Sequence, residues 1–320
     1  MESNILQVEN FTKFYTGYKG FFQQKSQSLA AVDDVSFELS EGKTLGILGE
    51  SGCGKTTLAR CLSGLTPVDT GTLYYKGQPV NLKQEKERAS WREKTQIIFQ
   101  DSFSSFDPKR TFNFSLKEAL QSRSSAGKAQ SDAAIKESLR LTGVGDDLLE
   151  RYPSQLSGGQ CQRMSIARTL LLQPEIVICD EPVSALDLTT QIQILNLLKQ
   201  LQWEKALSYI FISHDLMVIN YMSDEVAIMY RGSIVEKGVT IEVLKYPLHP
   251  YSQKLLASIP AASPFGEKTA SQLTEDYVVS SLYTGCKYFD KCLRHTDLCH
   301  KEKPVLGELG VNHFIACHYI

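Results

Sequence analysis

The chain has 320 residues, 42% of them apolar, which is enough for a large buried core and allows one to three domains. Its formal net charge of -2 does not suggest nucleic acid as the main ligand. No apolar run approaches the roughly 18 residues needed to span a bilayer, and the acidic start M-E-S-N lacks the basic and apolar regions of a signal peptide. We therefore expect a cytoplasmic protein that only a partner holds to a membrane.

The first motif is a glycine-rich stretch at residues 49–57. It satisfies G-x-x-x-x-G-K-[ST] and lies between an apolar run, Leu45 to Leu48, and a helix-like stretch, Thr56 to Leu65, as a phosphate loop requires. Its glycines let backbone N–H groups turn inward and cradle a polyphosphate, whereas a merely structural glycine turn is the alternative. We expect Lys55 to reach the β- and γ-phosphates. The predicted nucleotide-binding residues are Gly49, Glu50, Ser51, Gly52, Cys53, Gly54, Lys55, Thr56 and Thr57.

The next stretches define the organisation of the chain. We expect residues 1–240 to form one α/β domain, with a helical insertion at about 101–172, and residues 241–320 to form an extension. The mixed-charge stretch 83–94 is typical of a solvated surface, and the Ser-rich stretch 122–131 is most simply a linker.

Residues 156–160, L-S-G-G-Q, predict the start of a helix. Ser157 and Gln160 complete an [ST]-x-x-[EQ] capping box, and apolar residues follow at helical spacing from Met164. The N-terminus of such a helix attracts anions. A capping box alone is nevertheless a weak sign of function.

Two adjacent acids follow a short apolar run, Ile176 to Cys179, which is typical of a parallel strand buried on both faces. Such a strand delivers Asp180 and Glu181 to its carboxyl end. We expect Asp180 to bind Mg²⁺ through water and Glu181 to polarise the water that attacks the γ-phosphate. Capping of the next helix is the alternative, and the nearby phosphate loop makes it the weaker one.

Three further strands complete the predicted core. The buried run Ser208 to Ile212 delivers His214, and residues 225–238 predict a hairpin that turns at Arg231 and Gly232.

L-S-G-G-Q, followed by Gln162, Arg163 and Ala167-Arg168, resembles the signature of the ABC (ATP-binding cassette) ATPases. The resemblance implies a phosphate-loop NTPase fold, an α/β RecA-like core with an antiparallel β part and an inserted helical subdomain. It also implies that two cassettes close head to tail around ATP. Each signature would then contact the nucleotide of the other subunit through Ser157, Gly158, Gly159 and Gln160.

The same resemblance assigns residues that local sequence leaves open. It implies that Tyr15 stacks on adenine, that Gln100 senses Mg²⁺ and the membrane partner, and that His214 contacts the γ-phosphate. Residues 184–187 would form the dimer-crossing loop. The implied catalytic residues are Glu181, His214 and Gln100, and the implied Mg²⁺ ligands are Thr56, Gln100 and Asp180. Taken singly, Tyr15 is an ordinary strand aromatic and His214 a structural histidine.

Eight cysteines in a cytosolic protein argue against a disulfide framework. Cys53 most simply fills space, although an exposed thiol there would be sensitive to alkylation. Cys161 departs from the basic or amide residue that is commoner after the signature. The last four cysteines have the spacing C-x5-C-x6-C-x17-C, which matches neither zinc ribbons nor ferredoxins, so free thiols remain an alternative to zinc or a 4Fe-4S cluster. These four are Cys286, Cys292, Cys299 and Cys317.

The C-terminal part resembles a narrower group. H-P-Y-S-Q-K-L-L-A-S-I-P at 249–260, the later G-C-x5-C and A-C-H, and the loop at 17–28 are similar to the oligopeptide, dipeptide and nickel importer ATPases of the Opp and Dpp F type. Some members hold a 4Fe-4S cluster through these cysteines, which favours a cluster over zinc here. Nothing in the sequence places it near the phosphate loop, so we expect a structural role.

The expected function is that of the ATP-binding and hydrolysing subunit of an importer for peptides or related solutes, at the cytoplasmic face of the cell membrane. Its implied partners are a second, related ABC ATPase, two membrane permeases and an extracellular solute-binding protein. A nickel-chelate importer of the same family is one alternative. A soluble ABC ATPase acting on DNA is another, disfavoured because the chain has neither a second cassette nor a long coiled coil. Intact Glu181 and His214 disfavour a regulator that does not hydrolyse ATP.

Overall fold

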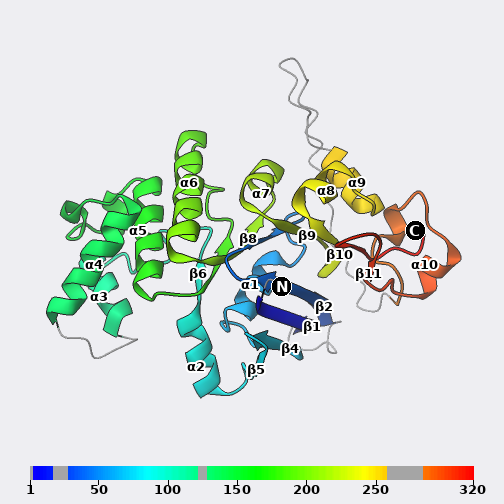
Figure 1. Cartoon of the computed structure of the whole chain (residues 1–320), viewed down its shortest axis with the longest axis horizontal. Helices are drawn as coiled ribbons and strands as arrows, with labels where there is room; N and C mark the ends of the chain where they lie inside the picture. The colour runs from blue at the N-terminus through cyan, green and yellow to red at the C-terminus, as the bar shows by residue number, and fades with distance from the viewer. Residues whose placement is uncertain (1–2, 17–27, 122–127, 258–283) are drawn as a thin grey trace, which may run out of the picture.

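The computed structural model describes residues 3–16, 28–121, 128–257 and 284–320. Its main sheet has the strand order β11-β12-β10-β9-β3-β8-β7-β6, in which β9, β3, β8, β7 and β6 run parallel (Figure 1). Every residue of β3, β7 and β8 is buried, which explains their uninterrupted apolar sequences. The strands are β3 (Thr44–Leu48), β6 (Thr95–Ile98), β7 (Ile176–Asp180), β8 (Ser208–Ser213), β9 (Glu225–Tyr230), β10 (Ser233–Val239), β11 (Gly307–Glu308) and β12 (His313–Ile315).

A second, antiparallel sheet has the order β2-β1-β4-β5. One hydrophobic cluster joins its inward side chains to helix α1 (Lys55–Leu62) and to the main sheet. Helix α2 (Glu85–Lys94), formed from the mixed-charge stretch, packs here through the buried Trp91. The strands are β1 (Asn4–Thr16), β2 (Ser28–Ser40), β4 (Thr70–Tyr75) and β5 (Gln78–Val80).

The helical region lies at one end of the molecule and consists of α3 (Phe112–Gln121), α4 (Lys128–Thr142) and α5 (Gly158–Leu171) (Figure 1). It has its own hydrophobic cluster, in which Cys161 is fully buried. That burial accounts for a small apolar side chain after the signature. The linker predicted at 122–131 is wrong from residue 128 onward, because helix α4 begins there; residues 122–127 lie outside the described part.

Four helices and a second hydrophobic cluster cover the other face of the main sheet: α6 (Leu188–Lys205), α7 (Leu216–Met222), α8 (Thr240–Lys245) and α9 (Pro250–Ala257). Helix α9 carries the H-P-Y segment. Among the described residues, none of the helices combines the length and the apolar character that crossing a membrane would require.

Residues 284–320, here called the C-terminal lobe, lie at the end opposite the helical region (Figure 1). They include α10 (Asp297–Lys301), and strand β12 pairs antiparallel with β10, so the lobe continues the main sheet. The fully buried Glu236 carboxylate accepts hydrogen bonds from the backbone N–H groups of Leu248 and His249 and lies 2.7 Å from His313 Nε2. These contacts fix the H-P-Y segment and the lobe to the same strand.

Candidate nucleotide site

A cavity of about 940 Å³ opens beside the phosphate loop. Residues 51–57 form its floor, and Tyr15, Gln100 and Glu181 contribute side chains to its wall. The cavity therefore gathers residues from three motifs that are far apart in the sequence.

The phosphate loop connects β3 to α1, as the sequence predicted. Gly54 caps α1 with a φ of 111°, and a Cβ atom there would lie 2.0 Å from the carbonyl oxygen of Ala31. Both the conformation and the close approach of β2 thus require glycine at this position. The loop amides lead directly into the N-terminus of α1, where an anion is stabilised.

Lys55 is almost completely buried beneath the loop. Its Nζ donates hydrogen bonds to the carbonyl oxygens of Gly49 (2.7 Å) and Glu50 (2.8 Å), which hold the charge at the end of β3. Cys53 is also buried, and burial raises the pKa of its thiol. The exposed, alkylation-sensitive thiol considered for Cys53 is therefore wrong.

Asp180 ends β7 directly under the start of α1. Thr56 Oγ1 donates to Asp180 Oδ1 across 3.2 Å, and burial raises the pKa of this carboxyl while the Thr56 contact opposes the shift. A hydroxyl that lines the cavity and a carboxylate in contact with it are ligands that suit Mg²⁺. The pair thus fits the predicted metal role.

Glu181 lies between two polar side chains from different elements. Gln100 Nε2 donates to its Oε2 (3.1 Å), and His214 Nδ1 lies 3.1 Å from its Oε1. Its backbone has a φ of 49°, an uncommon conformation for a residue with a side chain. Three predicted catalytic residues therefore meet at one carboxylate beside the cavity.

Tyr15 is 43% exposed and faces the cavity from the end of β1. Lys13 Nζ lies 5.7 Å from the centre of its ring. An exposed aromatic face at this position can stack on a planar base.

The signature motif begins α5 with the predicted capping box. Ser157 Oγ accepts from the N–H of Gln160, and the Gln160 side chain accepts from the N–H of Ser157. A Cβ atom on Gly159 would lie 2.5 Å from Thr190 in the first turn of α6, so the glycine lets these two helices approach closely. None of Ser157, Gly158, Gly159 and Gln160 lines the described cavity of the same chain.

The four C-terminal cysteines come together in the lobe. Burial raises the pKa of Cys286, and the thiols of Cys299, Cys317 and Cys292 add to that rise. Across the described ranges, however, no three His, Cys, Asp or Glu side chains are arranged to hold a metal ion. The predicted 4Fe-4S cluster is thus not supported by this geometry.

Comparison with known proteins places this arrangement in a family. Residues 32–184 match the model of the ABC transporter family, and residues 235–299 match the oligopeptide/dipeptide transporter C-terminal region. The oligopeptide transport ATP-binding protein AppF of Bacillus subtilis is 39% identical over 99% of this chain and 98% of its own length. OppF of Escherichia coli is 41% identical over 93% of this chain and 90% of its own. The chain belongs to the ABC transporter family.

Solved cassettes agree with this assignment. The ATP-binding cassette MJ0796, in a dimeric post-hydrolysis state bound to ADP and phosphate, matches 73% of this chain and 98% of its own with a TM-score of 0.64 and 26% identity. The fold predicted from the motifs is thereby confirmed. As an ABC ATPase, the chain hydrolyses ATP.

Three contacts to this cassette's nucleotide site were missed from the sequence. The Tyr251 hydroxyl accepts a hydrogen bond from the backbone N–H of Glu50 in the phosphate loop (3.3 Å), and Lys287 and Asp290 of the C-terminal lobe line the cavity. Residues of the C-terminal lobe therefore lie at the nucleotide site, which the sequence did not indicate. Tyr251 stands in the quoted H-P-Y motif, whereas no local signal marks Lys287 or Asp290.

Proposed function

We propose that this chain is the ATP-hydrolysing subunit that energises an importer for peptides or related small solutes. The observation that carries the proposal is the placement of Glu181 between Gln100 and His214 at the edge of the phosphate-loop cavity. The relatives named for oligopeptide and dipeptide transport, which cover nearly the whole chain, support the cargo class. A nickel-chelate importer of the same family is not favoured by any observation on this chain.

In this proposal, the amides of residues 51–57 and the ammonium of Lys55 bind the phosphates, and Tyr15 stacks on the adenine. Thr56, Gln100 and Asp180 would hold Mg²⁺, which supplies positive charge to the transferred phosphoryl group when bound.

Glu181 accepts the hydrogen bond that orients the attacking water, and the flanking amide and imidazole fix its carboxylate. His214 is close enough to this carboxylate to share the γ-phosphate end of the site. The three catalytic roles are thus divided among groups that already contact one another.

We infer that the signature acts on a second cassette. Ser157, Gly158, Gly159 and Gln160 begin a helix whose N-terminus favours an anion, and they stand apart from the cavity of their own chain. The other cassette is a related ATPase in a heterodimer. ATP favours the closed pair and hydrolysis the open one, and two permeases at the cytoplasmic face follow that shift while an extracellular protein delivers the solute.

We also propose that Cys286, Cys292, Cys299 and Cys317 ligate one centre, 4Fe-4S or zinc, which braces residues 284–320. The support is that four cysteines fall within a small lobe with few buried apolar residues, although their arrangement in this structure does not itself form a metal site among the described residues. Iron and zinc analysis of anaerobically purified protein tests this directly. Protein that contains neither metal would leave the four residues as free thiols.

The functional proposal is tested on the assembled transporter with a Glu181→Gln variant. The amide cannot act as a base, so ATP turnover should fall by about 10²- to 10⁴-fold while ATP stays bound. Hydrolysis at the wild-type rate would contradict the role of Glu181. Identification of the solute carried by the co-purified binding protein tests the cargo, and a carrier loaded with a nickel chelate instead of peptide would contradict that part.

A further inference from the structure

The turn between β9 and β10 joins the two walls of the nucleotide cavity. The N–H of Gly232 donates to the carbonyl oxygen of Cys53 in the phosphate loop (2.7 Å), and the Gly232 carbonyl accepts from the N–H of Asp33 in β2 (2.8 Å). A Cβ atom on Gly232 would lie 3.0 Å from the carbonyl oxygen of Ala30. The position of this turn therefore sets the position of the phosphate loop relative to β2.

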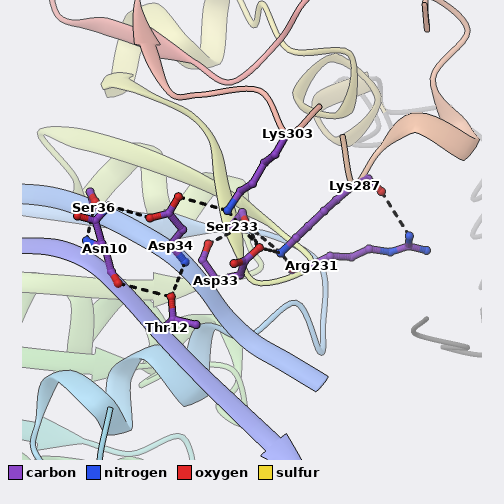
Figure 2. Close-up of polar contacts among 9 residues, drawn as sticks. All are labelled: Asn10, Thr12, Asp33, Asp34, Ser36, Arg231, Ser233, Lys287 and Lys303. Carbon is purple, nitrogen blue, oxygen red and sulfur yellow. Dashed lines mark hydrogen bonds and ion pairs between the residues drawn. The ribbon is translucent and has the colours of Figure 1, made fainter. Parts of the chain in front are cut away.

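Lys287 of the C-terminal lobe reaches into this junction (Figure 2). Its Nζ donates to the Arg231 carbonyl (2.6 Å) and to Ser233 Oγ (2.9 Å), and it pairs with Asp33 Oδ2 (2.6 Å). An ammonium has three donors, and all three have an acceptor here. The guanidinium of Arg231 in turn donates to the Lys287 carbonyl (3.3 Å), so the turn and the lobe hold each other twice.

The charged groups at the junction are partly buried and pair with one another. Burial opposes ionisation of Asp33, but the charge of Lys287, helped by Lys303, outweighs it and holds the pKa of this carboxyl below its ordinary value. Burial lowers the pKa of Lys287, and the Asp33 carboxylate opposes that shift. Lys303 pairs with Asp33 (3.2 Å) and Asp34 (3.3 Å). Loss of the Lys287 side chain would therefore leave Asp33 with a cation but remove the two hydrogen bonds that the ammonium donates to the turn.

A second line of contact runs from the same part of the lobe to the phosphate loop. Tyr288 follows Lys287 and packs its ring against those of Tyr230 and Tyr251. The ring centres lie 5.3 Å and 5.6 Å away, respectively. Tyr251 is the residue whose hydroxyl accepts from the N–H of Glu50. Lys287 itself lines the cavity.

We propose that the C-terminal lobe is a working part of the nucleotide site, and that Lys287 is a positioning residue that holds the Arg231–Gly232 turn against the phosphate loop and β2. Nucleotide affinity then depends on the lobe. Catalysis at saturating ATP does not, because Gln100, Glu181 and His214 are held by other contacts. The inference rests on the proposed binding of ATP in this cavity.

The test uses the full chain and a fluorescent ATP analogue, with ATPase kinetics on the assembled transporter. Lys287→Met should raise the Kd of the analogue and the KM for ATP about tenfold, with kcat within about twofold, as expected for loss of charged hydrogen bonds. The matched control is Lys303→Met, which removes the other cation that pairs with Asp33. Lys303 lines a second pocket and not the nucleotide cavity, so this variant should change the Kd of the analogue less than twofold. Lys287→Arg should restore part of the affinity.

The possible failures are distinguishable. If Lys287→Met leaves Kd unchanged, or if Lys303→Met weakens binding equally, the positioning role is overturned. If Lys287→Met does not fold, Ser233→Ala removes one acceptor of the same ammonium and should raise Kd two- to fivefold; an unchanged Kd would also overturn the inference. If the wild-type chain does not bind the analogue, or if Lys55→Ala binds it with the same Kd as the wild type, the proposed function is contradicted instead.

Discussion

The helical region and the C-terminal lobe lie at opposite ends of the molecule and are built in opposite ways (Figure 1). The helical region has its own apolar core and carries the signature, yet the signature does not line the described cavity of its own chain. The lobe carries no nucleotide motif, yet Lys287 and Asp290 line that cavity. The recognisable motif thus stands apart from the described cavity, whereas residues that no motif marks line it.

The difference lies in how each end is attached. Helices α3, α4 and α5 pack mainly on each other and share one hydrophobic cluster. The lobe adds β12 to the main sheet and inserts Lys287 between the turn and β2, so its attachment is continuous with the ATP site. Substitutions at the two ends should therefore have different effects. Those in the helical region should impair closure of the proposed cassette pair, and those in the lobe should weaken nucleotide binding.

Lys55 lies between the two ends, and its substitution should cause the largest loss of nucleotide binding. Lys55→Ala removes a buried ammonium that carries two charged hydrogen bonds at the base of the phosphate loop. In the proposed complex this ammonium binds the β- and γ-phosphates, so we expect nucleotide Kd to rise about 100-fold or more, because each charged hydrogen bond that is lost contributes roughly 1.5–3 kcal/mol. Equilibrium binding to the purified chain measures this. Near-normal affinity in the variant would show that the phosphates do not reach this loop.

At the helical end, Ser157→Arg should leave this chain's own affinity for ATP within about twofold, because Ser157 does not line its cavity. The added cation would crowd the anion site at the start of α5, so ATPase activity of the assembled transporter should fall roughly tenfold or more. Site-specific nucleotide cross-linking separates the two cassettes. Loss of labelling at this chain's own site, with the partner's site intact, would break the comparison.

The sequence could predict how the central motifs are brought together because their signals are local. Gly54, Lys55 and Thr56 are adjacent, and strand endings place Asp180 and His214 at the same sheet edge as the phosphate loop. The capping box of Ser157 is likewise complete within four residues.

The lobe contacts could not be predicted in this way. Tyr251 and Glu50 are separated by 201 residues, and Lys287 meets its acceptors only because β12 joins the sheet beside β10. A lysine and an aspartate without a motif look like ordinary surface charges in the sequence. The resemblance to the importer ATPases, by contrast, suggested a metal site at the four cysteines whose geometry the described residues do not form.

The smallest expected effect is a pH-dependent loss of stability at the H-P-Y segment, which packs between the lobe and the phosphate loop. His249 is buried, its Nδ1 accepts from the N–H of Tyr251, and burial lowers its pKa to about 4 from the model-peptide value of 6.5. Below pH 6.5 the unfolded chain therefore takes up a proton that the folded chain refuses until about pH 4. The free energy of unfolding should therefore keep its full value above pH 6.5 and decrease between pH 6.5 and about pH 4. At pH 5.5 the decrease should be on the order of 1 kcal/mol.

His249→Gln removes this titration, so its unfolding free energy should change less between pH 7.5 and pH 5.5 than that of the wild type. Urea unfolding of both proteins at the two pH values measures the difference in slope, whatever the absolute stability of the variant. Equal losses in the two proteins would mean that His249 does not drive the acid sensitivity. The variant should lose less unfolding free energy than the wild type between pH 7.5 and pH 5.5. If its ATP affinity also changes less between these pH values, the position of Tyr251 affects the phosphate loop.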